Sequence, residues 1–183
     1  MHTIKLVIDG ETVYQQALTD EMEPVKESAG ERIFKGFDAN RNILEYEGIV
    51  GEIQKWYYGY VSKTAWCATS LCYFAHKAGA LDAIGGKNEN VYYLMEACKK
   101  AAKEGKGTFY ERSQIPERIP RYAVLFWLWA GDKMDAGSRK HVGLAEFASS
   151  GETIYCIGGN QGDKICTKAY DRSQLYAIYT ING

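Results

Sequence analysis

The change of hydrophobic period at Pro120 is the feature of this 183-residue sequence that most limits the folds open to it. Before Pro120, apolar residues recur at the spacing of amphipathic helices. After Pro120, short apolar segments are separated by turns rich in Gly, Asp and Ser, which is typical of antiparallel strands. A helical half followed by a strand half predicts an α+β fold.

The spacing predicts three helices and about five strands. Helices are expected over residues 49–58, 65–78 and 90–104, and either Ser62 or Thr64 is placed to cap the second. Strands are expected over residues 123–129, 141–148, 153–157, 165–169 and 176–181.

Residues 1–47 differ from the rest of the chain. Alternating segments at Thr3–Ile8 and Thr12–Ala17 meet at Asp9-Gly10, which indicates a β-hairpin. Residues 18–47 are charged and weakly periodic, so no long helix is predicted there. We therefore expect an N-terminal extension of unknown role over residues 1–47 and one main domain over residues 48–183.

Charge and composition exclude several classes of partner. The formal net charge of −1 gives no electrostatic reason to expect nucleic acid or an anionic membrane as a partner. No apolar run approaches membrane-spanning length, and the N-terminus lacks the pattern of a secretory signal. We expect a protein made in the cytoplasm that has no membrane span.

The five Cys residues predict neither a disulfide framework nor a zinc site. Their number is odd and no C-x-x-C pair is present. Cys72 and Cys98 fall on apolar helix faces, where Cys packs as a small hydrophobe. Cys156 and Cys166 flank a turn, and whether they pair is left open.

Asp38-Ala39-Asn40-Arg41-Asn42 has the alternating oxygen ligands of a calcium loop. It lacks the glycine at the sixth position and the glutamate at the twelfth. A solvated turn is favoured over a calcium site at Asp38, and we expect neither a metal nor a cofactor.

Cys67 is the candidate nucleophile. It lies in the first turn of the helix predicted over residues 65–78, where backbone N–H groups lack helical partners. The helix dipole there stabilises a thiolate, and the Cys67 N–H can bind a developing oxyanion. The alternative is that Cys67 is a buried hydrophobe.

His141 is the candidate general base, because His2 is terminal and His76 does not face Cys67. Strand alternation places His141 on one face with Gly143 and Ala145. Asn160, one hairpin further on, is favoured as the residue that orients the imidazole. The alternatives for this third role are Gln161, Asp163 and Glu146.

Aromatic residues are abundant, with fourteen Tyr and four Trp. Most are explained by an aromatic core, but a groove lined with rings for a sugar or peptide is the functional alternative. We expect Tyr60, Trp66 and Trp127 to contact the substrate.

An ordered set of short motifs gives the chain a family resemblance. The motifs are Trp66-Cys67-Ala68, Ala78-Gly79, Pro120-Arg121 before a strand, His141-Val142-Gly143, Gly158-Gly159-Asn160-Gln161 and a closing Tyr-rich strand. Over about residues 50–181 this set resembles the CHAP group of cysteine, histidine-dependent amidohydrolases/peptidases, especially phage-type cell-wall hydrolases related to NlpC-type peptidases.

The resemblance implies a papain-like fold and an activity. It implies hydrolysis of an amide bond in bacterial peptidoglycan, with Cys67, His141 and Asn160 in the catalytic roles. Such a hydrolase would reach the cell wall through a holin or a dedicated export route. Two alternatives stay open, namely a toxin-like enzyme acting on a protein and a non-enzymatic phage structural or binding module.

Overall fold

The computed structural model describes residues 2–8, 11–18, 27–45, 47–62 and 64–182, with side chains from residue 27 onward. Strands β1 (His2–Ile8) and β2 (Glu11–Leu18) pair antiparallel, which confirms the predicted hairpin. The Asp9-Gly10 turn lies outside the described residues.

Four α-helices are present in the described part of the chain: α1 (Ala29–Asp38), α2 (Gly48–Tyr58), α3 (Cys67–Lys77) and α4 (Val91–Lys103). The predictions for α2, α3 and α4 are confirmed to within two residues. Short 3-10 turns lie at Asp82–Ile84, Arg112–Gln114 and Arg172–Gln174. No helix in the described ranges has the length and apolar character needed to cross a membrane.

Six antiparallel strands form the main sheet in the order β3-β8-β4-β5-β6-β7. They are β3 (Gly107–Glu111), β4 (Val124–Leu128), β5 (Lys140–Ala145), β6 (Thr153–Gly158), β7 (Cys166–Asp171) and β8 (Leu175–Ile181). The α+β class and five of the strands are as expected. β3 was missed because this short edge strand has no fully buried residue to give an apolar alternation.

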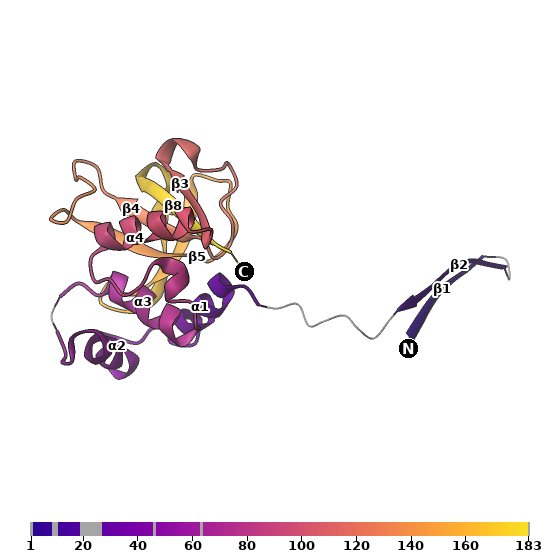
Figure 1. Ribbon diagram of the computed structural model, residues 1–183, viewed down its shortest axis with the longest axis horizontal. Helices are drawn as coiled ribbons and strands as arrows, with labels where there is room; N and C mark the ends of the chain where they lie inside the picture. Colours follow the sequence, from indigo (N-terminus) through magenta and orange to yellow (C-terminus); the bar gives the residue numbers. More distant parts are fainter. Residues whose placement is uncertain (1, 9–10, 19–26, 46, 63, 183) are drawn as a thin grey trace.

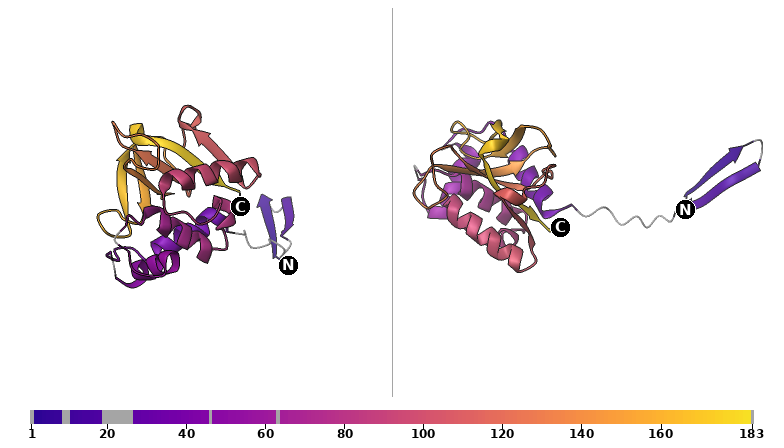
Figure 2. Two further views of the ribbon diagram at one scale, coloured as in Figure 1. Left: turned by 60° about the vertical axis from the view of Figure 1, so that its left-hand side comes forward. Right: turned by 90° about the horizontal axis from the view of Figure 1, so that it is seen from above.

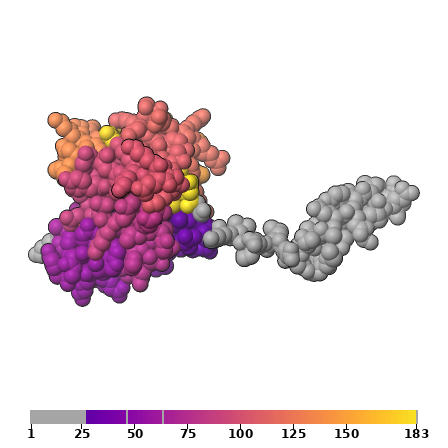
Figure 3. Space-filling view, in the orientation of Figure 1, coloured from indigo at the N-terminus to yellow at the C-terminus, as the bar shows by residue number. Residues whose placement is uncertain are grey.

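The helices pack on one face of the sheet, which Figures 1 and 2 show from three directions. Val142 and Leu144 of β5 face these helices and share their core. The opposite face carries a second, smaller core that includes Trp127, Ala145 and Cys156. In the space-filling view, the helical part in purple and magenta adjoins the strand part in pink and orange (Figure 3).

Helix α1 corrects the expected domain boundary at residue 47. Ile33 and Phe37 are fully buried in the main core, and the Phe37 ring lies 4.5 Å from that of Phe74 in α3. Gly36 makes this approach possible, since a Cβ there would lie 2.5 Å from the Phe74 ring. The few apolar residues of this helix are diluted by charged neighbours, so the segment shows little periodicity although α1 belongs to the main domain.

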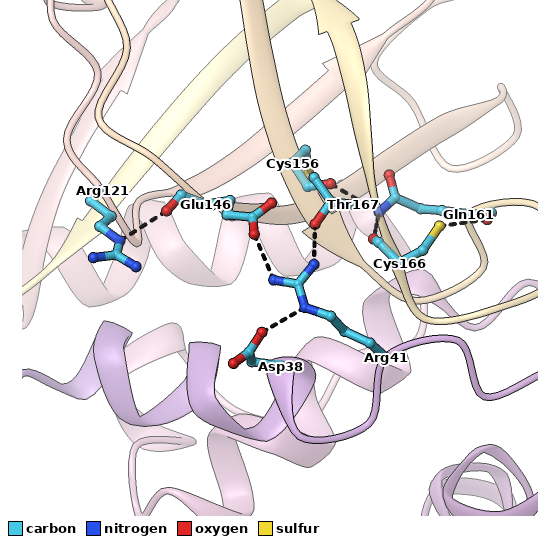
Figure 4. A network of polar contacts seen from close by, with 8 residues as sticks. All are labelled: Asp38, Arg41, Arg121, Glu146, Cys156, Gln161, Cys166 and Thr167. Carbon is cyan, nitrogen blue, oxygen red and sulfur yellow. Dashed lines mark hydrogen bonds and ion pairs between the residues drawn. The ribbon is translucent and has the colours of Figure 1, made fainter.

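Arg41 ties the turn after α1 to the sheet (Figure 4). Its guanidinium donates to Glu146 Oε1 at 2.6 Å, to Thr167 Oγ1 at 2.7 Å and to Asp38 Oδ1 at 2.5 Å. The Glu146 side chain is only 12% exposed, so this ion pair is less screened than a surface pair. The Asp38 carboxylate therefore pairs with Arg41, in the segment for which the sequence favoured a turn over a calcium loop.

The end of β6 passes close to the first turn of α3. A Cβ on Gly159 would lie 2.5 Å from the Trp66 ring and also overlap Ser70 Oγ, whereas a Cβ on Gly158 would lie 3.3 Å from His141 Nε2. The Gly158-Gly159 pair therefore lets one backbone segment lie against both the helix start and the imidazole.

We predict that Gly159→Ala destabilises the protein by about 2 kcal/mol or more, because the added methyl group overpacks a rigid contact with Trp66. Gly151→Ala is the matched control, since a Cβ there has only one neighbour, at 4.0 Å. Urea unfolding of both variants measures the effect. Equal free energies of unfolding for the two variants would contradict the close packing of β6 on α3.

Candidate active site

Cys67 is the first residue of α3, as the sequence predicted. The preceding residue, Trp66, takes the N-cap position but provides no side-chain hydrogen bond. Ser62 and Thr64 do not cap the helix, and their hydroxyls bond each other at 2.8 Å instead. The first backbone N–H groups of α3 therefore have no side-chain cap. They can interact with the Cys67 thiol and with a ligand bound beside it.

The Cys67 side chain is held against β5. It is 4% exposed, and burial raises the pKa of the thiol. Hydrogen bonds from the backbone of Val142 and Ala68 lower the pKa in part but do not outweigh burial. Cys67 is therefore a neutral thiol at pH 7, next to the strand residue that follows His141.

An open pocket of about 230 Å³ reaches Cys67 from solvent. Its wall bears both signs of charge, from Glu89 and from Arg139 and Lys140. Lys140 is close enough to favour the Cys67 thiolate slightly. The pocket is lined by Ala65, Cys67, Glu89, Asn90, Val91, Ser138, Arg139 and Lys140. A ligand in this pocket would contact the Cys67 thiol together with side chains of both charges.

His141 lies directly opposite Trp127 in the β4–β5 ladder and on the side of the second core. Its ring centroid is 5.8 Å from that of Tyr170. The side chain is 5% exposed, and burial lowers the pKa of His141 to about 4. The imidazole is therefore neutral at pH 7. Among the described residues, no hydrogen bond joins it to Cys67 Sγ, which lies against the backbone of Val142, the next residue of β5.

Gln161 is the polar residue beside the imidazole. His141 Nε2 faces Gly158, is buried, and has no hydrogen-bond partner among the described residues. The neighbouring Gln161 side chain favours the protonated form and opposes the fall in the pKa of His141.

The Gln161 carboxamide is fixed by its own bonds (Figure 4). Its Nε2 donates to the carbonyl oxygens of Cys156, Gly158 and Cys166, and its Oε1 accepts from Tyr170 Oη at 2.7 Å. Three carbonyl acceptors leave the amide nitrogen one orientation. Gln161 Oε1 is therefore the acceptor presented towards the ring edge.

Asn160, the expected third residue, lies in the turn. Its backbone has φ 59°, its side chain is partly exposed, and no side-chain hydrogen bond to His141 is present. Of the alternatives, Asp163 is exposed in the same turn and Glu146 pairs with Arg41. Gln161 differs from these residues in being a buried polar residue, only 1% exposed. No pattern in the sequence separated it from Asn160.

Two of the three expected substrate-contacting aromatic residues are core residues. Trp66 and Trp127 are fully buried, and this corrects the expectation that they line a groove. Trp66 packs against Gly159, and Trp127 stacks on Tyr170 with ring centroids 4.8 Å apart. Tyr60 is 62% exposed and remains available to a ligand.

All five Cys residues are free thiols. Cys166 Sγ donates to the Gln161 carbonyl oxygen at 3.1 Å and forms no disulfide with Cys156. Cys72 and Cys98 are buried, as expected for packing residues. Within the described residues, no group of three or more His, Cys, Asp or Glu side chains is placed to hold a metal ion.

Comparisons of the chain with protein-family models, curated proteins and solved structures found no match. The resemblance to CHAP domains expected from the sequence therefore rests on its ordered motifs alone.

We predict that acid destabilises the protein through His141. Above pH 6.5 the imidazole is neutral in both folded and unfolded chains and contributes nothing. Between pH 6.5 and pH 4 only the unfolded chain takes up the proton, so stability falls as pH falls, by about 3 kcal/mol in full. Urea unfolding of wild type and His141→Gln across this range isolates the loss, which the variant lacks. A His141 imidazole signal in NMR that titrates near 6.5 would refute the assignment.

Proposed function

We propose that this protein is a cysteine-dependent hydrolase with a papain-like domain of the CHAP type, which cleaves an amide bond of bacterial peptidoglycan, either the sugar–peptide link or a bond within the peptide. One observation carries the proposal. Cys67 begins α3 at the wall of an open pocket and lies against β5 at the residue next to His141. Helix start, thiol and imidazole are the parts that nucleophilic attack on an amide requires.

The neutral resting forms of both groups suit a general-base mechanism. The Cys67 thiol proton would pass to His141 Nδ1 as the sulfur attacks the amide carbonyl carbon. The C–N bond then breaks, the amine leaves with the proton from His141, and a thioester remains on Cys67. Water, deprotonated by His141, hydrolyses the thioester and restores the thiol. Catalytic hydrogen bonds that are long without ligand commonly tighten when substrate binds.

Two further groups would stabilise the charges that develop. The uncapped N–H groups at the start of α3 face the position of a carbonyl oxygen attacked by Cys67, and they can hold the oxyanion. Gln161 Oε1 can accept from Nε2–H of the imidazolium, which offsets part of the burial cost of that cation.

The charges of the pocket fit a stem peptide. Such peptides carry free carboxylates and amines within a few bonds of one another, and the pocket wall offers both an acidic residue, Glu89, and two basic ones, Arg139 and Lys140. Delivery to the wall by a holin or an export machine follows from the resemblance to phage-type hydrolases.

The test is release of new amino groups from purified peptidoglycan, with mass spectrometry of the fragments. We expect release by the wild type and a loss of at least about a thousandfold in Cys67→Ala. Cys166→Ser is the control, because it alters a partly exposed thiol outside the pocket and is expected to retain activity. Activity on protein extracts alone would favour the toxin-like alternative. No Cys67-dependent amine release from any substrate would refute the hydrolase.

A second prediction separates Gln161 from Asn160. Gln161→Ala is expected to lower kcat about a hundredfold and to lower the pKa of His141 further, because the imidazolium loses its acceptor. Asn160→Gly suits the positive φ and is expected to change neither quantity by more than about twofold. Rates of amine release and NMR titration of His141 give the two readouts. The reverse order of effects would return the third role to Asn160.

A further inference from the structure

Three tyrosines lie in series at the end of α2 next to the Cys67 pocket, with Tyr60 exposed and the other two partly exposed. We call Tyr57, Tyr58 and Tyr60 the tyrosine ladder. Their ring centroids lie 4.8 Å apart between Tyr57 and Tyr58 and 6.0 Å apart between Tyr58 and Tyr60. Gly59 caps α2 in the left-handed conformation, at φ 83°, and so turns the chain and returns Tyr60 to the side of Tyr58.

The ladder is held in place by polar contacts at its base. Tyr58 Oη accepts from Thr64 Oγ1 at 3.0 Å. Lys87 Nζ donates to the carbonyl oxygens of Trp56 and Tyr57 and lies 4.5 Å from the centroid of each of their rings. These contacts fix the helix end without covering Tyr60, whose side chain is more than half exposed. Preorganised rings lose little freedom when a ligand binds to them.

Glu89 joins the ladder to the Cys67 pocket. Glu89 lines the pocket, and its charge adds to burial, the main cause, in raising the pKa of Tyr57 and of Tyr58. Thr64, which bonds to Tyr58 Oη, directly precedes Ala65, another residue of the pocket wall. The ladder and the thiol therefore belong to one continuous surface. A ligand whose reacting amide reaches Cys67 would place an adjoining group over Tyr58 and Tyr60.

The chemistry of this surface favours a sugar over a peptide. Pyranose C–H groups pack on the negative faces of aromatic rings, and sugar hydroxyls pair with carboxylate and hydroxyl groups such as those of Glu89 and Thr64. A peptide would be recognised by pairing with a free strand edge. The ladder lies on a helix end, where the carbonyl oxygens of Trp56 and Tyr57 already accept from Lys87 and no strand edge is presented.

We propose that the tyrosine ladder is a saccharide-binding subsite that places an amino-sugar unit beside Cys67. The inference rests on the proposed hydrolase function and extends it, because a sugar held next to the thiol selects the amide that links glycan to peptide. Bonds far out along the peptide would leave the ladder unused.

The test uses the full chain in a Cys67→Ala background, which cannot consume the ligand. Calorimetry measures binding of a peptide-free tetrasaccharide of alternating N-acetylglucosamine and N-acetylmuramic acid, and of a free stem peptide. We expect the tetrasaccharide to bind and Tyr58→Ala/Tyr60→Ala to weaken it at least about tenfold. Tyr155→Ala removes a comparably exposed ring on β6, outside the ladder, and is expected to have no effect. Tyr60→Ala alone, at a largely exposed side chain, keeps the test valid if the double variant does not fold.

The outcomes separate this inference from the proposed function. Cys67-dependent amine release without tetrasaccharide binding would overturn the subsite and leave the hydrolase intact. Ladder-dependent binding of the tetrasaccharide without amine release would support the subsite and refute the hydrolase. Binding of the stem peptide alone, lost in the double variant, would overturn the saccharide assignment in favour of a peptide.

Discussion

The contact between the end of β6 and the first turn of α3 determines the rest of the site. The backbone of Gly158 and Gly159 lies against Trp66 on one side and His141 on the other. A Cβ on Gly159 would overlap Trp66, and a Cβ on Gly158 would be in tight contact with His141. Gly159 lets Trp66 lie flat against the strand, and this fixes where α3 begins and therefore where Cys67 lies. Gly158 leaves room for His141 on the other side. A bulkier pair would move the start of α3, and Cys67 with it, away from the strand that carries His141.

Burial gives this site its electrostatic character. Both Cys67 and His141 lie almost out of contact with water, so desolvation favours the uncharged form of each. A thiolate–imidazolium pair would need more compensating hydrogen bonds than Val142, Ala68 and Gln161 supply. Cys67 is therefore a thiol and not a thiolate in the protein without a ligand. Such an arrangement protects the thiol from adventitious oxidation, because thiolate character and exposure control that reaction.

The sequence predicted the structure best where the hydrophobic period was strong. It predicted least where the backbone conformation of a single residue sets which side chain is buried. The stripe of α3 placed Cys67 in the first turn, and alternation placed His141 with Gly143 and Ala145 on one face of β5. The alternation did not predict which of the two cores this face of β5 contacts. Asn160 and Gln161 are neighbours in one turn, and the positive φ of Asn160 directs the second inward and the first outward. The four apolar residues of α1 stand among charged neighbours in the sequence and so give little periodicity, although all four are buried.

The Arg41 contacts have a consequence for how the molecule opens. Glu146 is 105 residues from Arg41 in the sequence, yet its charge is balanced largely by that guanidinium. Detachment of α1 would leave a poorly solvated carboxylate at the end of β5, so fraying of the helix cannot proceed as an isolated local event. α1 and the sheet edge that bears Glu146 thus form a single cooperative unit. Amide hydrogens in both would exchange with solvent together, at a protection set by the whole unit.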